Sequence, residues 1–468
     1  MKKVVIVGGG IAGLAAAYTL QETQPDIEYT LIEKNPRLGG KILTEHEAGY
    51  LIEGGPDCFL SEKQSVLKLA EKVGLENSLI GTNDQHKGTY IYAGEKLHAL
   101  PEGLMLLVPT KIVPFALSPL ISWPGKLRMS LDFVLPKKRD QDDETLYSFV
   151  VRRLGREALD KIAEPLIGGI HGGDPETMSL KASFPRFLDM EKNYGSLVRA
   201  MLAGRKNTRR KPPAGYGGRP KSYFMSFKKG MGELPEALEK KLQGKIIKGK
   251  EATGIMRTDS GFLVEMEGKE QLCADGLVLA VPAPEAALLL QEVAPKVSPI
   301  LKSIPMASSA TIQLVYKRHQ VPKALNSFGF LVPHVEQRKI NAVTFASVKW
   351  NDRVPDQEHV LLRTFIGGAK NSPLALASEE EMMMWVKQDL KSILGITAEP
   401  EHYWVHRWID ARPQYTIGHL DRLQEIDKYL QKVPGLVLVG GCYRGIGVPD
   451  CVNDGIKGAK EVIACLTN

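Results

Sequence analysis

The sequence KKVVIVGGGIAGLAAAYTL, residues 2–20, joins a short apolar run to a glycine-rich turn and then to a helix-forming segment. Val4 to Val7 have the length and the β-branched side chains that are typical of a buried parallel strand. The glycines that follow have the spacing GxGxxG at Gly8, Gly10 and Gly13. This spacing lets the backbone turn tightly and approach a pyrophosphate, which the N-terminal end of the following helix attracts.

A second apolar strand, EYTLIE, covers residues 28–33 and ends in Glu33, twenty residues after Gly13. An acid at this distance accepts hydrogen bonds from the ribose hydroxyls of a dinucleotide. A glycine-rich turn alone is weak evidence, because other tight turns also need glycine. The strand, the turn, the helix and the acid together predict a dinucleotide-binding site.

The composition is that of a globular protein with more than one domain. The chain has 468 residues, of which 43% are hydrophobic and 25% charged, and its length predicts two or three domains. The formal net charge of +7 suits an anionic ligand but is too small for a nucleic-acid-binding protein of this size. The basic stretch of residues 204–229 lacks helical spacing and a companion fold, so we expect no nucleic-acid partner.

The cysteines and the apolar segments indicate in which cellular compartment the protein is found. Five scattered cysteines without CxxC spacing favour a reducing environment and predict no metal site. A strand that starts at Val4 leaves no room for a signal peptide. Residues 104–123 are apolar but are interrupted by prolines and a lysine, which excludes a clean membrane-spanning helix. We therefore expect a cytoplasmic protein.

Further glycine turns distinguish this chain from nicotinamide-dependent dehydrogenases. They are LGGK at residues 38–41 and GYLIEGGPDCF at residues 49–59. The segment GLVLVGGCYRGIGVPD, residues 435–450, is again strand, turn and helix start, and would return to the first sheet to aim backbone N–H groups at the same ligand. Extra turns suit FAD, because this longer cofactor must be threaded through the protein with its isoalloxazine buried. We expect FAD.

At this point the chain resembles the FAD family of amine oxidases, phytoene desaturases and protoporphyrinogen oxidases. Two segments outside the nucleotide fold are more specific: AEPLIGGIHGGDPETMSLKASFP at residues 163–185 and PQYTIGH at residues 413–419. They resemble the oxygen-dependent protoporphyrinogen/coproporphyrinogen oxidases of haem synthesis, in the soluble form of Gram-positive bacteria. The similarity runs over nearly the whole chain.

The resemblance implies an α/β fold with a Rossmann-like FAD-binding domain of the amine-oxidase/glutathione-reductase type. A mixed antiparallel-sheet substrate domain and a helical subdomain accompany it. We expect the FAD-binding domain in residues 1–85, 222–284 and 405–468. We expect the substrate-binding domain in residues 86–101 and 285–404, and the helical domain, which docks on a membrane in some relatives, in residues 102–221.

The resemblance also implies the reaction. A porphyrinogen, here coproporphyrinogen III and also protoporphyrinogen IX, loses six electrons while three O₂ become three H₂O₂. Aromaticity drives this oxidation and hydride transfer goes to the flavin N5, so we assign no catalytic side chain. Expected partners are the porphyrinogen and O₂, with ferrochelatase as a candidate and at most peripheral membrane contact. The alternatives are a flavin amine oxidase, a carotenoid desaturase or a non-catalytic binding protein like the GDP-dissociation inhibitors.

Site residues are carried over by motif. Animal relatives have an arginine where this chain has Thr89, which leaves recognition of the propionates open. The expected substrate residues are apolar walls and cations: Lys63, Ile170, Phe184, Phe330, Arg363, Phe365 and Arg444. The expected cofactor residues follow the turns: Gly8, Gly9, Gly10, Ile11, Ala12, Gly13, Glu33, Lys41, Gly55, Pro56, Asp57, Cys58, Ala252, Trp408, Ile446, Gly447 and Val448. Cys442 and Cys451 are expected to be small buried residues and not flavin attachment points.

Overall fold

The computed structural model describes residues 1–467 with the exception of 84, 86, 87, 102, 106, 110, 141, 208–221, 323 and 324. Much of the basic stretch predicted at residues 204–229 therefore lies outside the described residues. The first predicted elements are confirmed: they are β1 (Lys3–Val7), α1 (Ile11–Thr23) and β2 (Glu28–Glu33).

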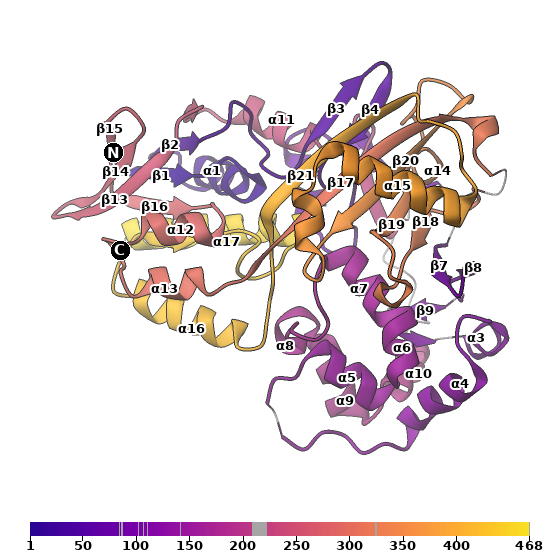
Figure 1. Cartoon of the computed structure of the whole chain (residues 1–468). Coiled ribbons are helices and arrows are strands. Elements are labelled where there is room, and N and C mark those ends of the chain that lie inside the picture. The colour runs from indigo at the N-terminus through magenta and orange to yellow at the C-terminus, as the bar shows by residue number, and fades with distance from the viewer. Residues whose placement is uncertain are drawn as a thin grey trace.

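A parallel sheet, in the order β12-β2-β1-β16-β22, forms the centre of the first domain. Its other strands are β12 (Lys245–Lys248), β16 (Gly276–Leu279) and β22 (Leu436–Leu438). Residues from the beginning, the middle and the end of the chain therefore build one sheet, and Figure 1 shows them side by side. The predicted α/β fold with a Rossmann-like parallel sheet is confirmed.

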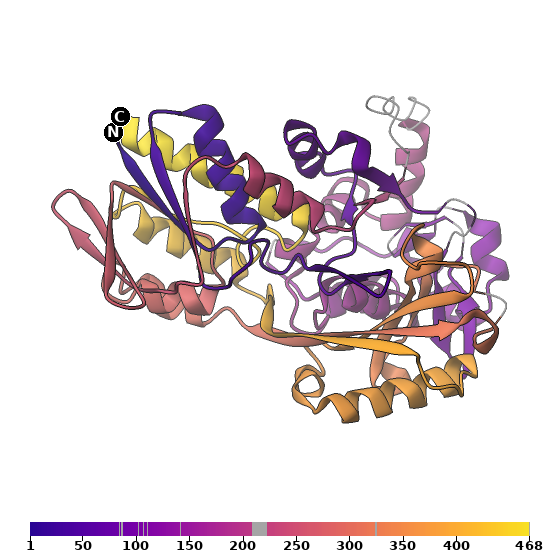
Figure 2. The ribbon, with the colours of Figure 1, turned by 90° about the horizontal axis from the view of Figure 1, so that it is seen from above.

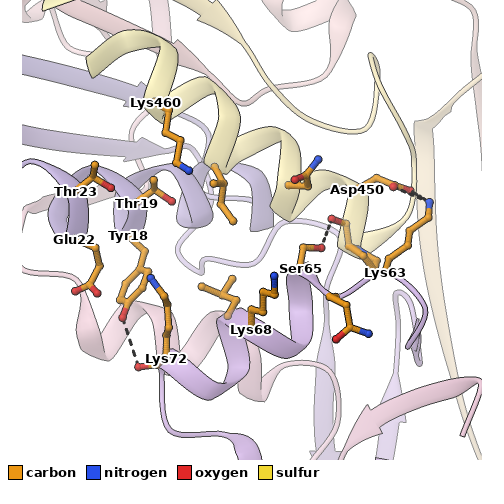
Figure 3. A pocket seen from close by; sticks show the side chains of 15 residues that line it. Tyr18, Thr19, Glu22, Thr23, Lys63, Ser65, Lys68, Lys72, Asp450 and Lys460 are labelled. Carbon is orange, nitrogen blue, oxygen red and sulfur yellow. Dashed lines mark hydrogen bonds and ion pairs between the residues drawn. The ribbon is translucent and has the colours of Figure 1, made fainter. Parts of the chain in front are cut away.

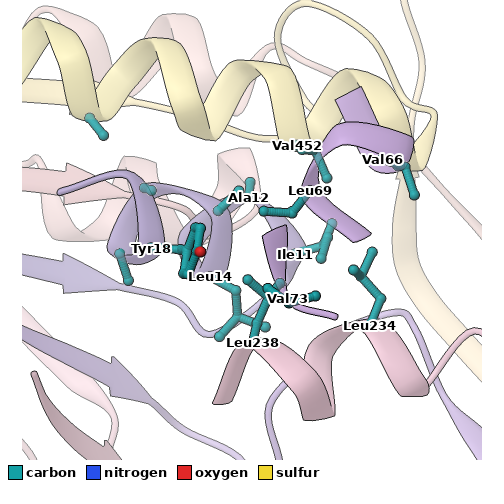
Figure 4. Close-up of a cluster of buried hydrophobic side chains, with 14 of the residues drawn as sticks. Ile11, Ala12, Leu14, Tyr18, Val66, Leu69, Val73, Leu234, Leu238 and Val452 are labelled. Carbon is teal, nitrogen blue, oxygen red and sulfur yellow. The ribbon is translucent and has the colours of Figure 1, made fainter. Parts of the chain in front are cut away.

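Both faces of the parallel sheet are covered, because the strands are apolar on both sides. Val4 and Ile6 of β1 belong to one buried cluster and Val5 and Val7 to another. The first cluster, drawn in Figure 4, joins the sheet to α1, α2 (Ser65–Lys72), α11 (Glu233–Lys241) and α17 (Val448–Thr467). The second joins it to α12 (Ala283–Leu289), α13 (Val297–Lys302), α16 (His419–Leu430) and the meander β13 (Ala252–Thr258), β14 (Gly261–Met266) and β15 (Glu270–Ala274).

A mixed sheet forms the second domain, in the order β21-β17-β20-β19-β18-β7-β8. Its strands are β7 (Tyr90–Ala93), β8 (Lys96–Ala99), β17 (Met306–Lys317), β18 (Gly329–Leu331), β19 (Ile340–Phe345), β20 (His359–Gly367) and β21 (His402–Pro413). Helix α15 (Glu379–Leu394) packs along one face, as Figure 2 shows. Residues 402–413 thus belong to this sheet, whereas α12 and α13 pack on the parallel sheet. The predicted boundaries near residues 285 and 405 fall inside these regions, and we keep the division into three parts as a proposal.

A helical region lies below the mixed sheet in Figure 1 and has its own cluster of buried hydrophobic residues. Its elements are β9 (Leu104–Met105), β10 (Val108–Pro109), α3 (Ile112–Leu117), α4 (Trp123–Ser130), α5 (Leu146–Arg153), α6 (Arg156–Ala158), α7 (Glu164–His171), α8 (Leu180–Ser183), α9 (Pro185–Tyr194) and α10 (Leu197–Asn207). Within the described part of the chain, no helix is both long enough and apolar enough to cross a membrane.

Short strands connect the domains. The hairpin β3 (Thr44–Glu47) and β4 (Tyr50–Glu53) contacts the mixed sheet through Tyr50 and Ile52. A small sheet in the order β5-β11-β6 lies beside α2 and contains β5 (Phe59–Leu60), β6 (Leu79–Gly81) and β11 (Phe224–Phe227). Helix α14 (Ala346–Lys349) follows β19 directly. The loop between β4 and β5 therefore lies where the two large sheets meet.

Candidate functional site

The first glycine turn leaves open space at the start of α1. Gly8 has φ +106°, and a Cβ there would lie 2.6 Å from the Ala280 carbonyl oxygen. A Cβ at Gly13 would collide with the Gly8 carbonyl, whereas a Cβ at Gly10 would meet nothing within 4 Å. Gly8 and Gly13 are therefore required by packing, and Gly10 borders a space that a ligand backbone or phosphate can approach.

Glu33 closes the side of this turn. The carboxylate is buried, and its Oε2 accepts a hydrogen bond of 2.7 Å from the Gly9 N–H. Its Oε1 accepts bonds from the backbone and side chain of Asn35, at 2.9 and 2.6 Å. Lys250 donates its N–H to the Glu33 carbonyl at 3.3 Å, so the start of β13, with Ala252, lies close to this acid. The geometry suits the ribose end of a dinucleotide, as predicted for Glu33.

A second turn and a second helix meet the first turn. The Gly39 N–H donates to the Gly9 carbonyl at 2.8 Å, and a Cβ at Gly40 would lie 3.0 Å from the Gly10 Cα. Helix α17 packs so closely on α1 that a Cβ at Gly455 would collide with the Ala12 carbonyl. The start of α1 therefore packs against the interior of α17, and the positive N-terminal end of α1 beside the two glycine turns suits an anionic cofactor.

The PQYTIGH segment supports the turn that precedes α17. Tyr415 accepts a hydrogen bond from the Gly445 N–H and donates one to the Gly441 carbonyl, both 2.8 Å long. Its ring stacks on His419 with 4.0 Å between centroids, and His419 Nε2 lies 2.9 Å from the Tyr443 carbonyl. Burial lowers the pKa of His419, which favours the neutral ring in this stack. The motif that indicated a porphyrinogen oxidase therefore orders the C-terminal glycine loop.

Side chains of the mixed sheet hold the loop after β4. Trp408 Nε1 donates to the Gly54 carbonyl at 2.8 Å, and the same oxygen accepts a bond of 3.0 Å from Thr311 Oγ1. Arg363 donates from Nη2 to the Gly55 carbonyl. The predicted residues Gly55, Trp408 and Arg363 are thus brought together, although they come from distant parts of the sequence.

Asp57 is the centre of a charged cluster in this loop. Its Oδ2 accepts hydrogen bonds from Lys349 Nζ at 2.8 Å and from Trp350 Nε1 at 3.0 Å. Arg363 Nη1 lies 3.6 Å from Asp57 Oδ1. Burial opposes the ionisation of Asp57, but the charges of Lys349 and Arg363 outweigh it and hold the pKa well below its usual range. Burial and the neighbouring Asp57 charge raise the pKa of the Cys58 thiol to about 12.

These features fit FAD. The residues that would hold its diphosphate and ribose are the first two glycine turns and Glu33, and the Asp57 loop and the α17 N-terminus would hold the flavin end. Cys442 Sγ accepts a hydrogen bond of 3.3 Å from the Ala283 N–H, and burial raises its pKa. Burial raises the pKa of Cys451 to about 12. Both thiols are therefore held neutral, which fits a non-covalent cofactor.

The structure distributes the predicted substrate residues over several places. Arg363 stacks on Phe365 at 4.7 Å beside the loop just described. Phe330 is fully buried and packs on Phe345 in the mixed sheet, and Phe184 packs on Phe187 in the helical region. The side chain of Ile170, in α7, lies outside the described residues.

Two predicted cations have acidic partners near α17. Lys63 Nζ lies 2.6 and 2.7 Å from the carboxylate oxygens of Asp450. Arg444 Nη2 donates to Asp427 Oδ1 at 2.8 Å. Lys63 and Asp450 line a pocket of about 640 Å³ between α1, α2 and α17, drawn in Figure 3. These contacts do not bring Lys63 or Arg444 into the Arg363 group, and their roles with substrate stay predictions.

Sequence reasoning missed Lys349, Trp350 and Arg412. The first two lie in the segment SVKW, residues 347–350, which has no spacing typical of a binding motif. Arg412 directly precedes the PQYTIGH motif. Its Nε donates to Ser309 Oγ at 2.9 Å. The sequence signal for Arg412 is its position directly before the motif, but its spatial neighbours depend on the pairing of β17 with β21.

Comparisons with known proteins find similarity along nearly the whole chain. The family described as flavin containing amine oxidoreductase matches residues 11–463. A coproporphyrinogen III oxidase of Bacillus subtilis is 34% identical, with 99% of this chain and 98% of that protein covered. A coproporphyrinogen III oxidase of Staphylococcus aureus is 32% identical, with 99% of each covered. A crystal structure from Exiguobacterium sp. 255-15 superposes with a TM-score of 0.86 at 32% identity, covering 100% of this chain and 99% of that one.

Proposed function

Because this chain belongs to the flavin-containing amine oxidoreductases, we propose that it oxidises a porphyrinogen, with coproporphyrinogen III as its main substrate. The observation that carries the proposal is the full-length similarity to coproporphyrinogen III oxidases. The same similarity favours this function over an amine oxidase, a carotenoid desaturase or a non-catalytic binding protein. Family membership also confirms the predicted FAD.

When bound, FAD supplies two-electron oxidation of the substrate and passes the electrons to O₂. Removal of six electrons from the porphyrinogen therefore needs three O₂ and releases three H₂O₂. The protein contributes binding and orientation. Asp57, Lys349 and Arg363 fix the loop after β4, and Trp408 fixes it from β21. This loop would hold the flavin end while the substrate lies against it.

The substrate side of the site needs apolar surface for the macrocycle and cations for its propionates. Phe365 is half-buried and Arg363 stacks on it, which gives both kinds of surface in one place. Arg363 keeps an Nε without a hydrogen-bond partner among the described residues. We propose Arg363 and Phe365 as substrate contacts, and protoporphyrinogen IX as a second substrate with fewer propionates.

We further propose contact with an anionic membrane surface through the face formed by α3, α4 and the following turn. Val113, Leu117, Trp123, Leu127 and Val134 have 67 to 77% of their surface exposed. Lys126 Nζ lies 4.5 Å above the Trp123 ring, which places a cation beside an aromatic side chain as in interfacial segments. We also propose that the protein is cytoplasmic and that it passes its product to a ferrochelatase.

The test is an oxidation assay with the purified holoprotein. Coproporphyrinogen III and protoporphyrinogen IX are each supplied in air, and porphyrin fluorescence and H₂O₂ are followed against free FAD. We expect fluorescence to rise faster than in the control, faster for coproporphyrinogen III, and to stop when O₂ is removed. A yellow protein that oxidises neither substrate faster than free FAD would refute the proposal.

A further inference from the structure

Arg412 carries a charge that the described protein does not neutralise. It lies at the end of β21, where Nε donates to Ser309 Oγ at 2.9 Å. No carboxylate of the described residues lies within 4 Å of its guanidinium, and its Nη1 and Nη2 have no hydrogen-bond partner there. Arg412 is half-buried, and a charge that is partly removed from water is normally paired, because desolvation of an isolated charge is costly.

The surroundings of Arg412 add positive charge. Burial lowers the pKa of Arg412 to about 10, and the positive charge of Arg363 contributes to the shift. Arg412 therefore stays charged near neutral pH. The ammonium group of Lys41 donates a hydrogen bond to the carbonyl of Ala411, the residue before Arg412. Arg363 has Asp57 as a partner, whereas no acid of the described residues pairs with Arg412. The group therefore has an excess of cations, although Arg412 is only half-buried.

The position joins the cofactor loop to the helical region. A Cβ at Gly172, just after α7, would lie 2.6 Å from Arg412 Nη1. Gly172 belongs to the GGIHGGD segment, which resembles the substrate-side segment of porphyrinogen oxidases. A bulge in the pairing of β17 with β21, where Asp410 has φ +42°, directly precedes Arg412. Bulges of this kind redirect a strand next to a site.

The free groups of Arg412 define the ligand chemistry. Its Nη1 and Nη2 form a planar fork that matches a carboxylate with two parallel charge-assisted hydrogen bonds. We propose that Arg412 binds a propionate carboxylate of the porphyrinogen and so acts as a specificity-determining residue. This inference rests on the proposed function, because the carboxylate is supplied by its substrate.

The experiment compares Arg412→Met with Arg412→Lys and with a matched control, Arg407→Met. Arg407 is on the same strand but is exposed and donates to the Ala377 carbonyl. Three quantities are measured on each holoprotein: KM and kcat for coproporphyrinogen III, the FAD content from its absorbance, and the Kd of coproporphyrin III. The Kd of coproporphyrin tetramethyl ester, which has no free carboxylate, is measured in the same detergent buffer.

We expect KM and the coproporphyrin III Kd to rise about tenfold or more in Arg412→Met, the range of a lost charge-assisted hydrogen-bond pair. Arg412→Lys should show a smaller rise, because it keeps the charge without the fork. The ester Kd, kcat and FAD content should change less than about twofold, and Arg407→Met should behave like the unmodified protein.

An unchanged Kd for coproporphyrin III in both Arg412 variants would overturn the inference. A loss of FAD with unchanged porphyrin affinity would also overturn it, because Arg412 would then serve the cofactor. If Arg412→Met does not fold, the test uses Arg412→Lys. The inference then requires that the ratio of the Kd of coproporphyrin III to the Kd of its tetramethyl ester be higher than in the unmodified protein. Failure of the unmodified protein to oxidise either porphyrinogen would refute the proposed function. The oxidation assay detects that failure independently of the binding measurements on the Arg412 variants.

Discussion

Asp57 and Lys349, 292 residues apart in the sequence, form an ion pair of 2.8 Å that ties the loop after β4 to α14. Trp350, the next residue, donates to the same carboxylate oxygen at 3.0 Å. The pair is mostly buried and therefore differs from ordinary surface ion pairs. It connects the loop that would hold the flavin end to the mixed sheet that carries the proposed substrate contacts Arg363 and Phe365.

Replacement of Lys349 by methionine should destabilise the protein. The change leaves Asp57 buried with Trp350 and the more distant Arg363, and breaking a buried pair costs up to about 3–5 kcal/mol. We expect a lower midpoint of urea unfolding, measured by fluorescence, and faster loss of FAD on dialysis. The control is Lys387→Met, which removes an exposed pair with Glu399 and should cost less than about 1 kcal/mol. Equal effects of the two variants would show that the buried pair has no special role.

Gly455→Ala should weaken FAD binding, because the new methyl group collides with the Ala12 carbonyl and pushes α17 away from α1. Overpacking of this kind costs about 1–3 kcal/mol. The expected result is a several-fold higher Kd for FAD, measured by titrating the apoprotein, together with a lower unfolding temperature. Asn453→Ala, an exposed position on the same helix, is the control. The packing argument fails if both variants bind FAD equally.

Glu53 should make stability depend on pH. Burial raises its pKa from 4.5 to about 7, although it accepts hydrogen bonds from Thr44 and from the Met231 N–H. Between these values the folded state keeps a proton that the unfolded state has lost. The contribution of Glu53 to the free energy of unfolding should therefore fall as pH rises, by about 1.4 kcal/mol per pH unit.

Urea unfolding of the unmodified protein and of Glu53→Gln at pH 5 and pH 7 measures this contribution. The difference in unfolding free energy between the two proteins should move in favour of Glu53→Gln at the higher pH. A difference that does not change with pH would mean that Glu53 has the same pKa in the folded and unfolded states.

Lys63→Glu should raise KM for coproporphyrinogen III several-fold, if Lys63 is a substrate cation as the resemblance implies. The change also places two carboxylates together at the N-terminus of α17, because Asp450 is the partner of Lys63. Lys68→Glu, another exposed lysine of the same pocket, controls for net charge. Unchanged KM with lower thermal stability would assign Lys63 to the Asp450 pair alone.

The exposed apolar face should bind anionic vesicles. Trp123 and Leu127 are one helical turn apart on α4 and are 71% and 69% exposed. The double variant Trp123→Ser/Leu127→Ser should sediment several-fold less with phosphatidylglycerol vesicles, because each buried apolar side chain contributes about 1.5–3 kcal/mol. Leu288→Ser, which changes an exposed leucine on α12, should bind like the unmodified protein. Binding unaffected by the double variant would exclude this face.

Much of the fold was predictable because its signals are local. The apolar run Val4 to Val7, the spacing of Gly8, Gly10 and Gly13, and the acid at Glu33 each reflect a requirement of one strand, one turn or one ribose contact. The later glycine turns extended the prediction to FAD, and the motif PQYTIGH indicated the family. The structure explains that motif through Tyr415 and His419, which hold the glycine loop.

The composition of the substrate side was not predictable in this way. Lys63 and Arg444 are cations in suitable segments, yet each has an acidic partner near α17. The Asp57–Lys349 pair depends on how the mixed sheet places residues that are hundreds of positions apart, and so does Arg412, which has no acidic partner among the residues that the structure describes. Spacing along the chain carries no information about such neighbours, and a charge acquires its role from what surrounds it. The sequence alone therefore determined the cofactor and the family, whereas tertiary packing determined which cations remain available to a substrate.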